Sequence, residues 1–135
     1  MSEPGGARVT VLVVDDDPAM RALLRDWLER AGYHVLEEES GERLLVAART
    51  ARFDAVILDK ELAGLGGLDV LPLLRRHREQ APVILVTAFG GPRVAEEALR
   101  LGAHAYLEKP FSLNALLRTV RAATGRRPDG GPADD

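Results

Sequence analysis

Four short apolar segments of this chain are each followed by polar side chains that could take part in chemistry. They are Asp15-Asp16-Asp17 after Val9–Val14, Asp59 after Ala55–Leu58, Thr87 after Val83–Val86, and Lys109 after Ala105–Glu108. If the four segments are buried parallel strands, their carboxyl ends meet along one edge of a sheet, where open α/β folds bind their ligands. Carboxylates, a hydroxyl and an ammonium group would then converge on one place.

The three consecutive aspartates divide into two groups. Asp17 directly precedes Pro18, which suits a first helical turn, so we expect Asp17 to cap a helix. Adjacent carboxylates such as Asp15 and Asp16 repel each other unless a cation lies between them. Because a small set of oxygen ligands suits magnesium or manganese, these two residues predict a divalent metal site.

Asp59 would lie beside such an ion, where its carboxylate could attack a phosphoryl group. Phosphoryl transfer needs a positioned nucleophile, a metal and further groups that stabilise the phosphoryl oxygens, and Lys109 and Thr87 could supply a cation and a hydroxyl. Taken singly, these residues are as well explained by a turn aspartate, a solvated lysine and a β-favouring threonine. Their shared position at strand ends favours phosphoryl chemistry.

Strand-like and helical patterns alternate along the chain. Apolar residues from Met20 to Ala31 recur at spacings of three and four, which predicts an amphipathic helix. The complete set is strands near 9–14, 33–37, 55–59, 83–87 and 103–107, with helices near 20–31, 42–49, 68–75, 92–101 and 112–123. This alternation favours a parallel sheet with helices on both faces. The weakly apolar second strand is expected at an edge, and Pro72 is tolerable only near the start of its helix.

Composition limits the class of protein. A chain of 135 residues suits one domain, and its 18 basic and 21 acidic residues show no basic patch for nucleic acid or an anionic membrane. It has no cysteine and three scattered histidines, which argues against a nitrogen or sulfur metal site. The N-terminus lacks a secretory signal, so we expect a cytoplasmic protein. Glycine and proline predict flexible tails at 1–7 and 125–135, the second able to begin a linker, around one domain at 8–124.

Four motifs in order resemble the receiver domain of bacterial two-component response regulators. They are Val11–Pro18, Asp54–Asp59, Pro82–Ala88 and Gly102–Phe111, and the resemblance extends over about residues 8–123. It implies a flavodoxin-like (βα)5 fold with a doubly wound parallel sheet of strand order 2-1-3-4-5. It also implies a signalling module that turns over no external substrate.

The resemblance implies a role for each site residue. Asp59 would accept a phosphoryl group from a phosphohistidine of a sensor histidine kinase or a phosphotransfer protein. The metal ligands would be Asp15, Asp16, Asp59 and the backbone carbonyl of Glu61, and the phosphoryl group would be bound by Thr87, Ala88 and Lys109. Thr87 and Tyr106 would form a switch, while Glu61 and Phe89 would tune the lifetime of the phosphate. The peptide bond between Lys109 and Pro110 would be cis. The switch would alter the face made by the fourth helix, fifth strand and fifth helix, where a downstream protein or a second copy could dock.

The chain departs from the family pattern after Asp59. Ala63 stands where the family usually has proline and Gly66 where it has aspartate, so we expect a more mobile loop. Glu61 adds a carboxylate at the mouth of the site, where it could orient water or repel phosphate. Lys60 could offset that charge, although we expect it to point to solvent.

Two other functions remain open at this point. A haloacid-dehalogenase-type phosphatase would use Asp15 and Asp17 as its paired aspartates, but Ala19 stands where that pattern has Thr or Val, and the late acidic pair Asp134-Asp135 lies in an expected tail. A receiver-like module could instead bind a partner without any phosphate. Too few residues follow Ala123 for an output domain, so we expect the chain to act by docking.

Overall fold

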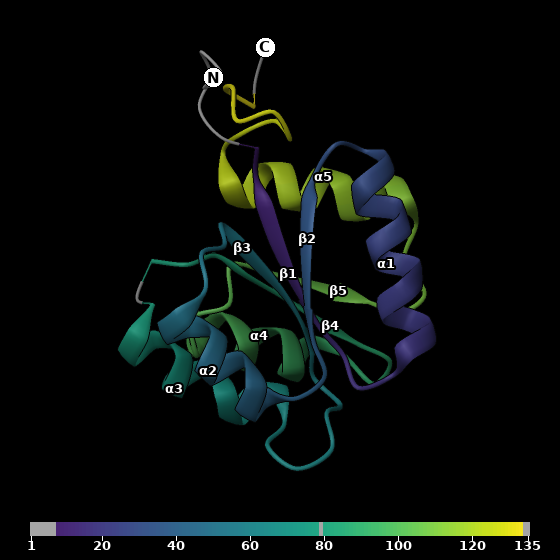
Figure 1. Cartoon of the computed structure of the whole chain (residues 1–135). Coiled ribbons are helices and arrows are strands. Elements are labelled where there is room, and N and C mark those ends of the chain that lie inside the picture. Colours follow the sequence, from purple (N-terminus) through teal and green to yellow (C-terminus); the bar gives the residue numbers. More distant parts are fainter. Residues whose placement is uncertain (1–7, 79, 134–135) are drawn as a thin grey trace.

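The computed structural model describes residues 8–78 and 80–133. The predicted tail at 1–7 and the pair Asp134-Asp135 therefore lie outside the described residues. In chain order the elements are β1 (Thr10–Val14), α1 (Pro18–Arg30), β2 (His34–Glu38), α2 (Gly41–Thr50), β3 (Ala55–Asp59), α3 (Gly67–His77), β4 (Val83–Thr87), α4 (Pro92–Arg100), β5 (Ala105–Glu108) and α5 (Leu113–Thr124). Strands and helices alternate strictly, as the periodicity predicts (Figure 1).

The five strands form one parallel sheet in the order β2-β1-β3-β4-β5, which confirms the predicted fold class. The register pairs Val14 with Leu58 and Asp59 with Val86, and it pairs Thr87 with Glu108. The carboxyl ends of β1, β3, β4 and β5 therefore lie at nearly the same level. This alignment brings the polar residues that follow the strands to one edge of the sheet.

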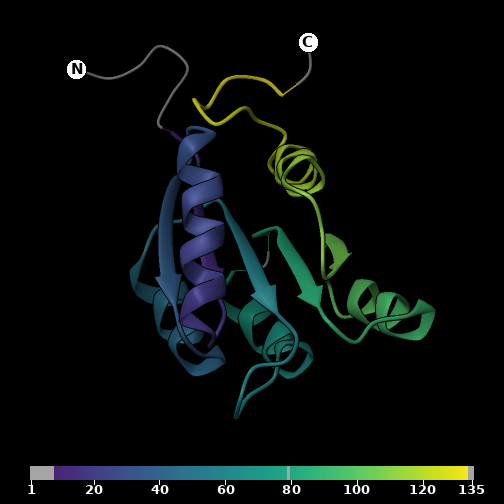
Figure 2. The ribbon, with the colours of Figure 1, turned by 90° about the vertical axis from the view of Figure 1, so that its right-hand side faces the viewer.

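The sheet is buried on both faces, because its strands are almost continuously apolar. One layer of the core joins Leu12, Val14, Val56, Leu58, Val83 and Leu85 to residues of α2, α3 and α4. The other joins Val11, Val13, Ile57, Ile84 and Val86 to residues of α1 and α5. Figure 2 shows α1 and α5 on one side of the sheet and the remaining helices on the other. Successive side chains of each strand point to opposite faces of the sheet, so helices pack against both faces.

Local chemistry explains most of the helix ends. The side chains of Asp17, Ser40 and Ser112 each accept a backbone N–H of the first turn of α1, α2 and α5. Gly125 ends α5 with φ of 67°, a left-handed conformation that suits glycine. Pro72 differs from expectation, because it lies in the second turn of α3 rather than at its start. It is solvent-exposed, so water can hydrate the carbonyl that loses its helical donor.

Residues 125–133 follow the last helix and lie against the amino-terminal edge of the sheet. The Val9 N–H donates to the Pro128 carbonyl at 2.9 Å, and Arg126 pairs with Asp54 at 2.8 Å. Figure 1 shows this segment at the opposite end of the sheet from the strand ends that hold the acidic residues. The flexibility expected from its composition stays a prediction. Within the described residues, no helix has the length and apolar character needed to span a membrane.

Candidate functional site

The described part of the chain buries three polar side chains, and all three lie at the carboxyl edge of the sheet. Asp15, Asp59 and Thr87 are exposed by 1%, 4% and 0%. Asp15 follows β1, whereas Asp59 and Thr87 are the last residues of β3 and β4. Lys109 directly follows β5, where its N–H donates to the Thr87 carbonyl at 2.8 Å. The strand ends therefore bring together the residues that the sequence singled out.

Three carboxylates form a cluster that suits a divalent cation. Asp15, Asp16 and Asp59 each offer an oxygen, and these atoms lie within 4.8 Å of one another. Asp15 Oδ1 accepts the Asp17 N–H at 2.9 Å, but among the described residues Asp15 Oδ2 is buried without a hydrogen-bond partner. A buried carboxylate oxygen without a donor is costly, and a hard cation would satisfy it. The residues present thus fit magnesium, while the Glu61 carbonyl as a further ligand stays a prediction.

Lys109 provides the positive charge beside this cluster. Its Nζ lies 3.4 Å from Asp59 Oδ2 and 3.6 Å from Asp15 Oδ2. The following peptide bond, between Lys109 and Pro110, is cis. A single ammonium group therefore faces two buried carboxylates, which leaves negative charge in excess at this edge.

This environment sets the proton affinity of Asp59. Burial raises the pKa of Asp59 to about 6, and the neighbouring Asp15 and Glu61 carboxylates add to that effect. The Glu61 N–H, which donates to Asp59 Oδ1 at 3.0 Å, and Lys109 act in the opposite direction. Asp59 is thus still mostly ionised at neutral pH but gains a proton more readily than an exposed aspartate.

The side chain of Glu61 lies across the phosphoryl-binding groups that the resemblance implies. The Thr87 hydroxyl donates to Glu61 Oε2, and the Ala88 N–H donates to Glu61 Oε1 at 3.0 Å. Lys60 Nζ lies 3.1 Å from Glu61 Oε2, so the expectation that Lys60 points to solvent is wrong. Partial burial would raise the pKa of Glu61, but the hydrogen bonds from Thr87, Ala88 and Lys60 outweigh it and lower that pKa.

Sequence reasoning missed this arrangement of Glu61 and also a contact of Arg21. Arg21 Nη1 donates to the Asp15 carbonyl at 2.6 Å, and its Nε pairs with Glu37 at 3.2 Å. Glu61 stands two positions after Asp59 and directly after Lys60, and this pattern could have predicted an ion pair at the site. Helical periodicity only placed Arg21 on a polar face, and nothing in it pointed to Asp15.

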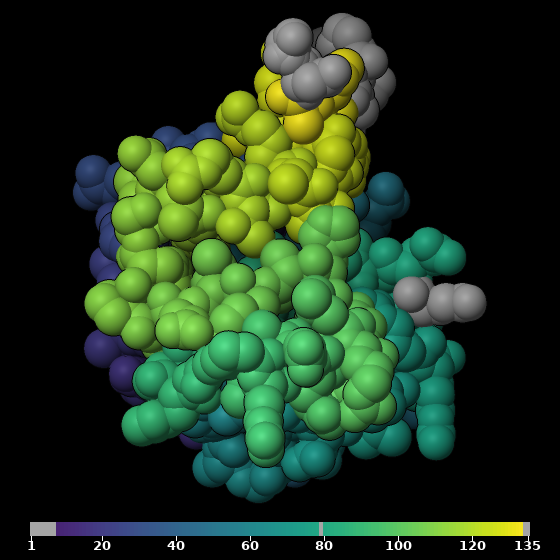
Figure 3. Space-filling view, turned by 180° about the vertical axis from the view of Figure 1, so that it is seen from behind, coloured from purple at the N-terminus to yellow at the C-terminus, as the bar shows by residue number. Residues whose placement is uncertain are grey.

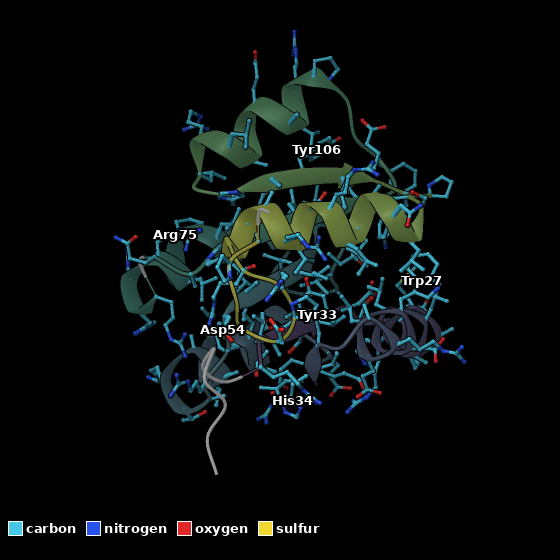
Figure 4. All side chains as sticks on the ribbon, turned by 90° about the horizontal axis from the view of Figure 1, so that it is seen from above. Trp27, Tyr33, His34, Asp54, Arg75 and Tyr106 are labelled. Atoms are coloured by element: carbon cyan, nitrogen blue, oxygen red, sulfur yellow. The ribbon has the colours of Figure 1, made fainter. Side chains whose placement is uncertain are left out.

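Tyr106 of β5 lies between β5 and α4, as Figure 4 shows. Its hydroxyl accepts the Gly91 N–H at 2.9 Å and donates to Glu108 at 3.1 Å. A Cβ at Gly90 would lie 1.7 Å from this hydroxyl, so the position of Tyr106 requires glycine there. Phe89, by contrast, is 73% exposed. Tyr106 thus packs against the loop that continues from Thr87 and Ala88.

An apolar groove opens beside Lys109, between α1 and the start of α5. It encloses about 510 Å³ and is lined by Met20, Leu23, Leu24, Trp27, Ala88, Lys109, Pro110 and Phe111. The rings of Trp27 and Phe111 meet edge to face with centroids 6.5 Å apart, and Leu23 is 42% exposed. The acidic cluster therefore has an accessible apolar surface next to it.

Comparison with known proteins points to one family. Residues 11–121 match the model of the response regulator receiver domain. The transcriptional regulatory protein TcrA of Mycobacterium tuberculosis is 39% identical over 120 residues, which cover 89% of this chain and 47% of TcrA. Such curated relatives are longer proteins, of which this chain spans between 25% and 59%.

Solved structures agree with this match. A putative response regulator from Chloroflexus aurantiacus has a TM-score of 0.83 and 32% identity, over 88% of this chain and 99% of that one. The receiver domain of a sensor histidine kinase from Pseudomonas aeruginosa has a TM-score of 0.81 and 28% identity, over the same shares of the two chains. That structure holds a magnesium ion in its active-site cleft.

Proposed function

Because this chain belongs to the response regulator receiver domain family, we propose that Asp59 accepts a phosphoryl group from a phosphohistidine of a sensor histidine kinase or a phosphotransfer protein. Receiver domains are signalling modules of two-component systems, not enzymes that turn over a substrate of their own. The observation that carries the proposal is the buried Asp59 carboxylate, which clusters with the Asp15 and Asp16 carboxylates and lies 3.4 Å from the Lys109 ammonium group.

The transfer step follows from the chemistry of these groups. A carboxylate oxygen of Asp59 forms a bond to phosphorus while the bond from phosphorus to the histidine nitrogen breaks, and the bonding electron pair returns to the imidazole. Lys109 pairs with the phosphoryl oxygens, and the Thr87 hydroxyl and the Ala88 N–H donate hydrogen bonds to them. Water later attacks phosphorus, which releases inorganic phosphate and restores the Asp59 carboxylate.

Receiver domains bind magnesium at an acidic pocket, and this chain has a matching cluster. Asp15, Asp16, Asp59 and the Glu61 carbonyl would hold magnesium or manganese, with Asp15 acting through water. The bound cation would neutralise charge as the phosphoryl group approaches the carboxylates. The unpartnered Asp15 Oδ2 supports this assignment.

The donor protein must bring its histidine against Asp59, so its docking surface must border the site. The apolar groove beside Lys109, which includes the exposed Leu23 of α1, meets that requirement. Its apolar lining suits an apolar helical surface of the kinase or phosphotransfer protein.

The output surface is the face formed by α4, β5 and α5, which Figure 3 shows from behind the molecule. Thr87 and Tyr106 connect Asp59 to this face through the loop at Ala88–Gly91. Phosphorylation would shift the population of two arrangements of that loop and so control docking of a downstream protein or a second copy of the chain.

The phosphatase alternative finds no support at the aspartates. The Asp17 side chain accepts the Ala19 N–H at 3.0 Å and caps α1. That contact commits it to a helix end rather than to the pocket of Asp15 and Asp59, as the sequence predicted for Asp17.

Two-dimensional amide NMR with magnesium, before and after addition of the acyl-phosphate mimic beryllofluoride, tests the proposal. Shifts at Asp59, Thr87, Ala88, Tyr106 and Lys109 in the wild type, absent in Asp59→Asn, would support it. Asp26→Asn, which removes an exposed carboxylate on α1, should respond like the wild type. A wild-type spectrum that changes with neither magnesium nor the mimic would contradict phosphoryl acceptance at Asp59. It would favour the alternative of a receiver-like module that binds its partner without phosphate.

A further inference from the structure

The Glu61 carboxylate occupies the two hydrogen-bond donors that a phosphoryl group on Asp59 would need. Oε2 accepts from the Thr87 hydroxyl, and Oε1 accepts from the Ala88 N–H at 3.0 Å. An anionic, two-oxygen acceptor thus bridges the same pair of groups. In shape and charge, this carboxylate resembles one side of a phosphoryl group.

Both donors have only one proton to give. A backbone N–H has a single hydrogen, and so does a hydroxyl. The Thr87 oxygen already accepts the Phe89 N–H at 2.9 Å, so its own hydrogen is the one directed to Glu61. A phosphoryl oxygen and the Glu61 carboxylate therefore cannot use Thr87 and Ala88 at the same time.

Displacement of Glu61 requires only a movement of its side chain. The Glu61 N–H is held by Asp59 Oδ1 at 3.0 Å, which keeps the backbone beside the phosphoryl acceptor. The side chain is 28% exposed, so solvent lies on one side of it, and Lys60 contacts the same carboxylate at 3.1 Å. Rotation toward solvent would free both donors while Lys60 remains close enough to pair with the displaced charge.

We propose that the Glu61 carboxylate is an internal competitor of the phosphoryl group, held by Thr87, Ala88 and Lys60 until phosphorylation displaces it. This inference rests on the proposed phosphoryl acceptance at Asp59. It assigns Glu61 a positioning role in the unphosphorylated chain, because its carboxylate accepts the same Thr87 hydroxyl hydrogen that a phosphoryl oxygen would accept. Phosphorylation then exchanges one anion for another at these donors, which weakens the net gain from binding the phosphoryl group.

Titration with beryllofluoride in the presence of magnesium tests the competition, with amide NMR of the intact chain as the readout. Glu61→Ala removes the competing acceptor, so the concentration of mimic at half saturation should fall by about tenfold, the effect of one hydrogen-bonded charge. Glu61→Gln keeps a neutral oxygen for Ala88 and should fall between the wild type and Glu61→Ala. Glu29→Ala, which removes an exposed carboxylate from the end of α1 with the same change in net charge, should leave the midpoint unchanged.

A second readout needs no mimic. In ligand-free Glu61→Ala, the Ala88 amide loses its acceptor and should exchange with solvent faster than in the wild type. If the wild type binds the mimic but Glu61→Ala binds it equally or more weakly, Glu61 is not a competitor, and the role of Asp59 stands. If neither protein binds the mimic, the proposed function fails, while unchanged Ala88 exchange would separately show that Glu61 does not hold these donors.

Discussion

The amino-terminal and carboxyl edges of the sheet differ in how fully their charged side chains are paired. At the amino-terminal edge, the Arg75 guanidinium donates to the carbonyls of Ala81 and Gly102, and Asp54 accepts the Thr10 N–H while it pairs with Arg126. Figure 4 views the molecule from this edge, where Asp54 and Arg75 are labelled. At the carboxyl edge, Asp15 has a buried oxygen without a hydrogen-bond partner among the described residues.

This contrast separates stability from function. Polar groups that satisfy one another stabilise the fold but have nothing left to offer a ligand. Buried polar groups without enough hydrogen-bond partners destabilise the fold, and a ligand that pairs with them stabilises it on binding. The excess negative charge at the carboxyl edge is therefore consistent with the cation site that we propose there.

The largest effect is expected at the amino-terminal edge, from Arg78→Ala. The Arg78 guanidinium donates to the carbonyls of Ala48, Ala51 and Phe53 and stacks 4.1 Å from the Phe53 ring centroid. Its loss leaves these carbonyls without a donor and should lower the free energy of unfolding by about 2 to 4 kcal/mol. Urea denaturation measures this change, and Arg76→Ala on the exposed side of α3 is the control. A loss no larger than that of the control would contradict the role of Arg78.

Magnesium should stabilise the carboxyl edge by nearly as much. A ligand at a hundred times its dissociation constant stabilises the folded state by about 2.7 kcal/mol. We expect the melting temperature to rise with magnesium in the wild type and to respond far less in Asp16→Asn, which loses one of the clustered carboxylates. Sodium chloride at matched ionic strength separates binding from screening. An equal response of both proteins would argue against a site at Asp16.

Asp59→Asn should stabilise the metal-free protein at neutral pH. Because the pKa of Asp59 is raised from 3.8 to about 6 in the folded state, its contribution to stability is complete below pH 3.8 and is lost as the pH rises through about 6. The variant avoids that loss and should gain on the order of 1 to 3 kcal/mol at pH 7, and much less at pH 4. Urea denaturation across this pH range in the presence of a chelator measures the difference. A gain that is independent of pH would refute the raised pKa as its cause.

The smallest effect is expected from Asp54→Asn at the opposite edge. The amide can still accept the Thr10 N–H, so the change weakens only the partly exposed pair with Arg126. The free energy of unfolding should fall by about 0.5 to 1 kcal/mol, with the sign opposite to that of Asp59→Asn. If both variants stabilise the protein, the contrast between the two edges does not hold.

Much of the fold could be predicted from local patterns. The apolar strands and the three-and-four spacing in α1 depend on short segments, so they survive without knowledge of the rest of the chain. The same holds for the Asp17 cap, which needs only the following turn. Helix boundaries differed by one or two residues, and Pro72 was tolerated deeper in α3 than its local effect suggested, because that position faces solvent.

The partners of individual side chains could not be predicted in this way. Lys60 was expected in solvent but pairs with Glu61, and Arg21 supports the Asp15 carbonyl from a helix. Each contact depends on a side-chain rotamer and on the distance between backbones, and sequence spacing encodes neither. Residues 125–133 illustrate the same limit, since their glycine and proline content shows no sign of the contact between Pro128 and Val9.

The sequence by itself determined the order of strands and helices and the polar residues that end each strand, because the pattern of apolar residues and the family motifs lie along the chain. Only the tertiary structure decided how those residues share their protons and charges. Glu61 reaches Thr87 and Ala88, 26 and 27 residues away, because parallel pairing sets the ends of β3 and β4 side by side. Hydrogen bonds of this kind depend on positions to within a fraction of an ångström, and folding alone supplies that precision.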